Sequence, residues 1–115
     1  PGTCSMLKSK GLIDAIPVNF VRGLTFNKTA VIVDEAQNLT KGELVTIMTR
    51  FGRNSKYIVC GDCMQSDIKQ SGYRDVFDKL DDDDCNQQGI HTTKFGFAEI
   101  VRSKILRFIC KKLGA

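Results

Sequence analysis

Short apolar runs that end abruptly at polar positions divide the chain into expected strands. Residues 29–33 and 56–60 are nearly continuous in apolar or β-branched side chains, and an acidic residue or a glycine follows each of them at once. Residues 16–20 form a third short apolar run, and residues 90–95 form a weaker one. Strands without polar alternation are typical of parallel sheets that are covered on both faces. The pattern therefore predicts buried, parallel strands at these four places.

Between and after these apolar runs, apolar residues recur at the spacing of an α-helix. Thr40 and Glu43 have the spacing of a capping box, and the apolar residues that follow them recur at helical intervals. The sequence thus predicts a helix that begins there and stops near Gly52. The remaining expected segments are a short helix at residues 73–80, an acidic and polar loop at residues 81–89, and an amphipathic closing helix from residue 98 onward.

The alternation of strands and helices predicts an α/β fold with a mainly parallel sheet flanked by helices. The chain has 115 residues without an internal repeat, and 42% of them are hydrophobic, so that it can bury one core. We therefore expect residues 1–115 to form a single domain.

The composition indicates the charge of a partner and the cellular compartment. The excess of 17 basic over 13 acidic residues gives a net charge of +4, which favours an anionic partner. Five cysteines, odd in number and irregularly spaced, are typical of reduced thiols in the cytoplasm. No apolar stretch approaches the roughly 20 residues that span a bilayer, and no secretion signal is present. We expect a soluble, cytoplasmic protein, and an upstream portion before Pro1 because the chain does not begin with methionine.

The most informative chemistry follows the strand at residues 29–33. Asp34 and Glu35 come directly after it, at the edge where parallel sheets bind ligands. Mg²⁺ prefers a few carboxylates together with waters and substrate phosphates, so Asp34 suits the metal, while Glu35 suits an attacking water. An ordinary acidic turn is the alternative, and the buried strand before the pair and Gln37 after it count against that alternative.

A second polar segment follows the strand at residues 56–60. Gly61 permits a tight exit from the strand, and Asp62 and Gln65 then add a carboxylate and an amide. Neighbouring parallel strands end at the same edge of a sheet, so both polar segments are expected to lie together. Taken alone the second segment is more readily an ordinary turn, but together with the first it favours a ligand site.

Several segments in a fixed order resemble one family. The sequence VIVDEAQN at residues 31–38 resembles the Walker B motif of PhoH-like ATPases, which are relatives of superfamily one helicases, and GDCMQSD at residues 61–67 resembles their third helicase-type motif. Three further segments are similar: RGLT at residues 22–25, TRFG with SK at residues 49–52 and 55–56, and EIVR at residues 99–102. The resemblance covers roughly residues 18–109. It implies a partial RecA-like P-loop NTPase fold.

The resemblance also implies roles for individual residues. It implies that Asp34 binds magnesium and that Glu35 is the catalytic carboxylate. It also implies that Gln65 couples the state of the phosphate to conformation, and that Arg102 contacts phosphate in cis or across a subunit boundary. The nucleotide contacts that it implies are Asp34, Gln37, Arg22, Thr25 and Asp62. The expected cofactors are ATP and Mg²⁺, and the expected partners are a nucleotide, RNA or single-stranded nucleic acid, and further copies in a homo-oligomer. Leu24 and Glu99 depart from the family pattern, which has arginine and aspartate there.

One expected element is missing from the sequence. No Gly-x-x-x-x-Gly-Lys-Ser/Thr loop occurs, so no backbone nest or lysine is available to hold the β and γ phosphates. In the family that loop precedes the segment seen here. We therefore expect ATPase activity from a complete core, and little or none from these 115 residues alone.

Other interpretations remain open. Cys60 and Cys63 have C-x-x-C spacing and, with Cys85 and His91, would complete a zinc site, although Cys60 is better explained as the inward-facing end of a strand. The acidic run at residues 81–84 lacks the alternating spacing of a calcium loop and favours solvation. The basic side of the closing helix is equally compatible with solvent and with nucleic-acid phosphates. An alternative to the ATPase function is a non-catalytic interaction module that acts through protein contacts.

Overall fold

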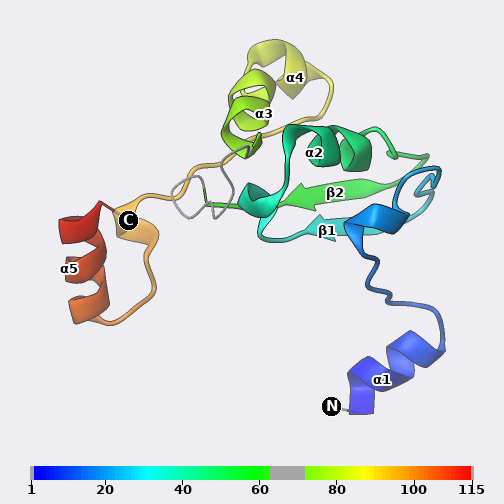
Figure 1. Ribbon diagram of the computed structural model, residues 1–115, viewed down its shortest axis with the longest axis horizontal. Coiled ribbons are helices and arrows are strands. Elements are labelled where there is room, and N and C mark those ends of the chain that lie inside the picture. The colour runs from blue at the N-terminus through cyan, green and yellow to red at the C-terminus, as the bar shows by residue number, and fades with distance from the viewer. Residues whose placement is uncertain (1, 63–71, 115) are drawn as a thin grey trace.

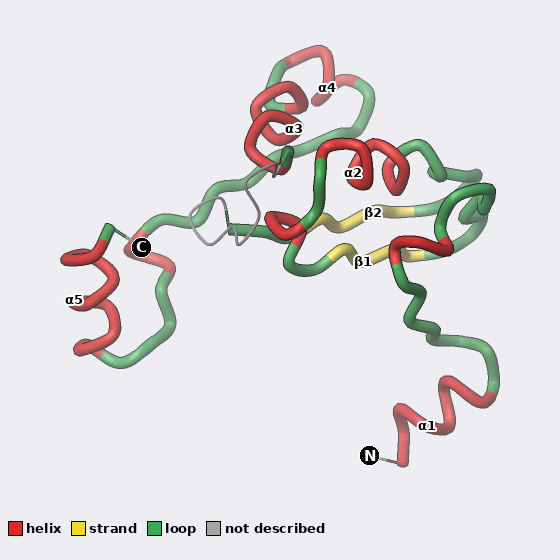
Figure 2. Tube along the Cα trace, in the orientation of Figure 1, coloured by secondary structure: helices red, strands yellow, loops and turns green. Residues whose placement is uncertain are grey.

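A computed structural model describes residues 2–62 and 72–114 of the chain. Figure 1 shows its helices and strands in chain order, and Figure 2 shows the same view coloured by secondary structure. The elements are α1 (Gly2–Ser9), η1 (Val18–Phe20), β1 (Ala30–Val33), η2 (Ala36–Asn38), α2 (Lys41–Met48), β2 (Lys56–Val59), α3 (Tyr73–Leu80), α4 (Asp83–Gln87), η3 (Phe97–Glu99) and α5 (Lys104–Leu113).

The centre of the fold is a parallel sheet of two strands, β1 and β2. Ile32 pairs with Ile58, and Val33 pairs with Val59, so the two strands end at the same edge. Both strands lie within the apolar runs that predicted them. The parallel α/β fold expected from the sequence is therefore confirmed.

Helix α2 crosses from the end of β1 to the start of β2 and begins at the predicted capping box. The Thr40 hydroxyl accepts the Glu43 N–H at 3.2 Å, and the Glu43 carboxylate accepts the Thr40 N–H at 2.8 Å. These two bonds satisfy backbone donors that a helix start otherwise leaves open. The helix ends at Met48, four residues before the glycine at which it was expected to stop.

The core lies between one face of the sheet and helices α2 and α3. Ala36, Leu44 and Tyr73 are buried there, and side chains from both strands pack against them. Tyr57 on this side of the sheet donates its hydroxyl to the Ile47 carbonyl at 3.1 Å, and burial raises the pKa of Tyr57. Figure 1 shows α2 and α3 above the strands.

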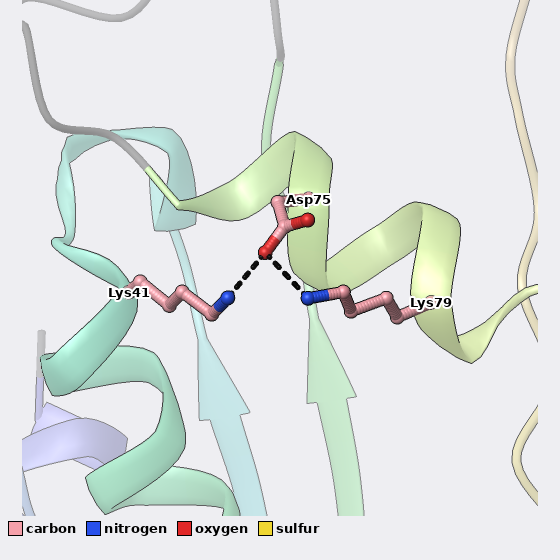
Figure 3. A network of polar contacts seen from close by, with 3 residues as sticks. All are labelled: Lys41, Asp75 and Lys79. Carbon is pink, nitrogen blue, oxygen red and sulfur yellow. Dashed lines mark hydrogen bonds and ion pairs between the residues drawn. The ribbon is translucent and has the colours of Figure 1, made fainter.

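The start of α3 lies tightly against the start of α2. A side chain at Gly72 would come within 2.3 Å of the Lys41 Cβ, so only glycine fits there without movement. Asp75 of α3 forms an ion pair with Lys41 at 2.6 Å and a second with Lys79 at 3.2 Å (Figure 3). The bond from Lys41, followed by that from Lys79, lowers the pKa of Asp75. The Lys41–Asp75 pair joins α2 to α3, while the Lys79–Asp75 pair lies within α3.

The opposite face of the sheet is open, which corrects the expectation of a sheet covered on both faces. Ile32 is 69% exposed, and its register partner Ile58 is 55% exposed. Exposed and partly buried residues alternate along each strand, because alternate side chains point to opposite faces. Helices α2 and α3 cover only the side on which the partly buried residues lie.

Two of the four predicted strands are wrong. Residues 16–20 contain η1, in which the Phe20 N–H donates to the Pro17 carbonyl at 3.0 Å. Pro17 has no N–H to offer a neighbouring strand, so it favours this turn. Residues 90–95 have no regular structure, because a strand needs a neighbour for its backbone hydrogen bonds and neither β1 nor β2 pairs with this segment.

The acidic segment also differs from the expected loop. It contains α4, and the Asp82 carboxylate caps that helix by accepting the Cys85 N–H at 2.8 Å. Acidic residues are stabilised at helix starts, where unpaired N–H groups and the helix dipole favour negative charge. That backbone bond lowers the pKa of Asp82. An aspartate followed by further acidic residues is a local signal for a helix start, so the prediction of a solvated loop at residues 81–89 is wrong for this segment.

The closing helix starts later than expected. Ser103 caps α5 by accepting the Leu106 N–H at 3.4 Å, so the helix begins at Lys104 and not near Ala98. Gly114 ends it in the left-handed conformation, with φ of 67°. Figure 1 shows α5 and α1 apart from the sheet, and neither helix has a buried residue among those described.

The outlying helices leave the chain more extended than a compact domain. Its radius of gyration is 16.6 Å, whereas about 13 Å is typical of a compact domain of this length. In the part of the chain that the structure describes, no helix is both long enough and apolar enough to cross a membrane.

Candidate functional site

The end of β1 places two carboxylates at the edge of the sheet. Asp34 follows the strand, and its Oδ1 accepts the Glu35 N–H at 2.9 Å. Glu35 has a left-handed backbone with φ of 52°, which L-residues adopt at a cost of roughly 1–2 kcal/mol. Both side chains are exposed. The sharp turn after β1 therefore presents two carboxylates to solvent, and such backbone strain is common at functional sites.

The end of β2 is joined to the end of β1 by backbone hydrogen bonds. The Cys60 N–H donates to the Val33 carbonyl at 2.8 Å, and the Ala36 N–H donates to the Cys60 carbonyl at 2.9 Å. These bonds continue the ladder past the two strands. Asp62, two residues beyond Cys60, is thereby held beside the turn that follows β1.

Gln37 connects the two strand ends through its side chain. It is only 2% exposed, which is unusual for a glutamine. Its Nε2 donates to the Glu35 carboxylate, and its Oε1 accepts the Asp62 N–H at 3.0 Å. Buried side-chain polar atoms are generally hydrogen-bonded, because an unpaired polar group away from water is costly. Gln37 therefore fixes the turn after β1 relative to the loop after β2.

Gly61 is required by the close approach of α3. A Cβ built on Gly61 would lie 2.8 Å from the Tyr73 ring and 3.1 Å from the backbone nitrogen of Gln37. Tyr73 is 8% exposed and belongs to the core. Sequence reasoning gave Gly61 the role of a tight exit from the strand, but it missed Tyr73, which no polar motif marks.

The polar groups of the two strand ends surround one open depression of about 230 Å³. The residues that line it are Asp34, Glu35, Gln37, Gly61, Asp62 and Arg102. Arg102 reaches it from a bend ahead of α5, where Arg107 donates to the Ile100 carbonyl at 2.6 Å. Three carboxylates therefore face one guanidinium across a small space.

This donor set fits a magnesium–nucleotide complex in part. Carboxylate oxygens are the protein ligands that Mg²⁺ prefers, and a guanidinium suits phosphate oxygens. Asp34 and Asp62 are the candidate metal-side groups, because they leave the ends of neighbouring strands. Among the described residues, no lysine lines the depression.

Five of the eight predicted site residues meet in this depression. Arg22 lines a separate hollow of about 420 Å³ beside the start of α2, together with Thr40 and Glu43. Thr25 is exposed and lines neither hollow. Gln65 lies outside the described residues. The nucleotide contacts expected of Arg22 and Thr25 remain predictions.

The expectation that Cys60 faces the core is wrong. Cys60 is exposed, not directed inward, because it continues the alternation that places Ile58 on the open face of the sheet. Among the described residues, no cluster of three or more His, Cys, Asp or Glu side chains is placed to bind a metal ion. Cys63 of the proposed zinc set falls outside them. His91 contacts Asn86, with its Nδ1 3.1 Å from the amide oxygen.

The fold and the site together define the class of protein. A parallel pair of strands flanked by helices, with carboxylates gathered at the carboxyl ends of the strands, is consistent with part of a P-loop NTPase fold. The family described as PhoH-like protein matches residues 2–113. The chain therefore belongs to the PhoH-like family, as its motifs predicted.

Individual relatives agree with this assignment. A PhoH-like protein of Mycobacterium tuberculosis (strain H37Rv) is 34% identical over 109 residues, which are 92% of this chain and 30% of that protein. Protein PhoH of Escherichia coli (strain K12) is 34% identical over 98 residues, and a PhoH-like protein of Synechocystis is 45% identical over 62 residues. These matches cover 83% and 54% of this chain, and 27% and 19% of those relatives. The chain thus spans less than a third of the length of the relatives it matches.

Proposed function

We propose that this chain forms the metal-binding and water-positioning side of an ATP site in a PhoH-like ATPase core. The observation that carries the proposal is the meeting of Asp34, Glu35, Asp62 and Arg102 around one depression at the carboxyl ends of two parallel strands. Ligands bind at this edge in open α/β sheets. Residues far apart in the sequence, from 34 to 102, converge there.

The roles follow from the chemistry of each side chain. Asp34 would hold Mg²⁺, which would supply positive charge against the phosphate groups when bound. Glu35 would accept a proton from the attacking water, and Arg102 would contact the transferred phosphoryl group. Gln65 would respond to the state of the phosphate, as the family resemblance implies. The nest that holds the β and γ phosphates must come from residues outside this sequence.

The relatives support a division of the site between this chain and other residues. They are more than three times as long as the segment that they share with it. We therefore propose activity for a complete core, coupled to work on RNA or single-stranded nucleic acid and carried out by a homo-oligomer. The basic residues of α5 are the candidate nucleic-acid contacts.

A chimera tests the proposed function. In it, the 115-residue chain replaces the matched segment of the M. tuberculosis relative, and Mg²⁺-dependent ATP hydrolysis is compared with that of the unaltered relative and of the isolated chain. We expect hydrolysis by the chimera and none by the isolated chain. Glu35→Gln should lower the rate by about 10²–10⁴-fold, because general bases contribute that much. Asp78→Asn, on the exposed surface of α3, is the matched control.

Two results would contradict the proposal. One is an unchanged rate in the Glu35→Gln chimera while the Asp78→Asn chimera is equally active. The other is Glu35-dependent hydrolysis by the isolated chain, which would show that no further phosphate-binding residues are needed.

The second candidate function is a non-catalytic interaction module. The specific observation in its favour is the open apolar face of the sheet, on which Ile32 and Ile58 are both more than half exposed. This function predicts a chimera that folds but hydrolyses ATP no faster with Glu35 than with Gln at that position. The ATPase assay above therefore separates the two functions.

A further inference from the structure

The open face of the sheet is apolar although it faces solvent. Ala30 and Ile32 of β1 share it with Lys56 and Ile58 of β2, since these residues pair in register. Ile32 and Ile58 lie side by side with exposed fractions of 69% and 55%. We call these two isoleucines, with Ala30, the open face.

A sheet that is meant to face water has a different pattern. Its strands alternate apolar residues toward the core with polar residues toward solvent. Here both faces of β1 are apolar, and in β2 only Lys56, at its start, is charged. Such strands are typical of parallel sheets that carry helices on both faces. The open face therefore has the composition of a buried surface.

The described helices of this chain do not cover it. Helices α2 and α3 pack on the other face with the core residues Leu44 and Tyr73. Helices α1 and α5 lie apart from the sheet, as Figure 1 shows, and neither has a buried residue. The cover for the open face is thus absent from the described parts of the chain.

The relatives contain a long stretch of chain beyond the segment that they share with this one. About 70% of the M. tuberculosis relative lies outside its match with this chain. We propose that the open face is the docking surface for a helix-bearing polypeptide equivalent to this unmatched part of PhoH-like proteins. Docking places an apolar helix over Ile32 and Ile58. The inference rests on the family and on packing, and does not require ATP hydrolysis.

The test compares the same substitutions in the isolated 115-residue chain and in the chimera. Ile58→Glu and Ile32→Glu place a charge on the open face, while Val45→Glu is the matched control on α2, in the opposite layer, where Val45 is 46% exposed. Thermal midpoints and resistance to protease are measured without nucleotide, so that a failure of the proposed ATPase function does not affect the readout.

We expect Ile58→Glu to lower the midpoint of the chimera by about 5–10 °C, because a buried, unpaired charge is strongly destabilising. The same substitution should shift the isolated chain by less than about 2 °C, as should Val45→Glu in either protein. If Ile58→Glu prevents the chimera from folding, Ile58→Ala supplies a milder variant, with a smaller loss in the chimera and none in the isolated chain.

Three outcomes would overturn the proposal. Equal tolerance of Ile58→Glu and Val45→Glu in the chimera would show that nothing docks on the open face. An equal loss in chimera and isolated chain would show that the chain covers the face itself. Sedimentation of the isolated chain as a dimer that Ile58→Glu dissociates would assign the face to a second copy.

Discussion

Gln37 is the residue whose replacement tests the geometry of the site most directly. Gln37→Leu keeps nearly the same volume but removes the donor to the Glu35 carboxylate and the acceptor for the Asp62 N–H. At 2% exposure, water cannot easily replace these partners. The Asp62 loop and the turn after β1 should therefore lose their fixed relationship while the two strands remain paired.

The size of the effect follows from the two bonds. A hydrogen bond to a charged group contributes about 1.5–3 kcal/mol and a neutral one about 0.5–1.5 kcal/mol, while the apolar leucine recovers part of the loss. We expect a net loss of about 1–3 kcal/mol in the free energy of unfolding. Gln37→Glu should cost more at neutral pH, because two carboxylates at hydrogen-bond distance repel each other. That extra cost should fall as the pH is lowered, because protonation of one of the two carboxyls removes the repulsion.

Urea denaturation measures the loss in unfolding free energy, and the amide resonance of Asp62 reports the local bond. In Gln37→Leu this resonance should shift upfield and its hydrogen exchange should accelerate. Gln87→Leu, which replaces an exposed glutamine of α4, is the control and should change neither. Unchanged stability together with an unchanged Asp62 amide in Gln37→Leu would refute the bridging role of Gln37.

Three further predictions concern the scaffold of the site. Leu44→Ala should cost about 2–5 kcal/mol in a urea denaturation curve, because Leu44 is 1% exposed and its loss leaves a cavity in a small core. Gly61→Ala should displace the Tyr73 ring and change the near-ultraviolet circular dichroism, since the new Cβ would lie 2.8 Å from that ring. The ion pairs lower the pKa of Asp75, so their stabilisation is present above its ordinary value near 4 and is lost as the pH falls below it. Asp75→Asn should remove this pH dependence, and high salt should weaken the effect in the unaltered chain, because the pairs are exposed.

The elements that the sequence predicted correctly carry their own local signals. The apolar runs that became β1 and β2 are short and β-branched, and the capping box at Thr40 contains both partners of its reciprocal bonds. The strand predictions that were wrong depended on a pairing partner that the local sequence does not reveal. Residues 90–95 have no neighbouring strand for their backbone groups, and pairing is a property of the whole sheet.

In the candidate site too, local sequence predicted some features and only the tertiary structure decided others. The order of motifs placed Asp34, Glu35 and Asp62 at strand ends, and the parallel pairing of β1 and β2 then brought those ends together. The sequence could not separate Arg102, which lines the depression, from Arg22, which lines a different hollow. Both arginines belong to family-like segments, and only the path of the chain between them and the sheet distinguishes them.

By itself, the sequence determined the α/β class, the family and the residues that follow each strand, because periodicity, capping and turn chemistry act over a few neighbours. The tertiary structure alone decided that Gln37 is buried between two strand ends, that Cys60 faces outward and that one face of the sheet is open. Burial depends on which elements pack together. Two isoleucines in similar apolar runs remain exposed here because no described helix lies over them.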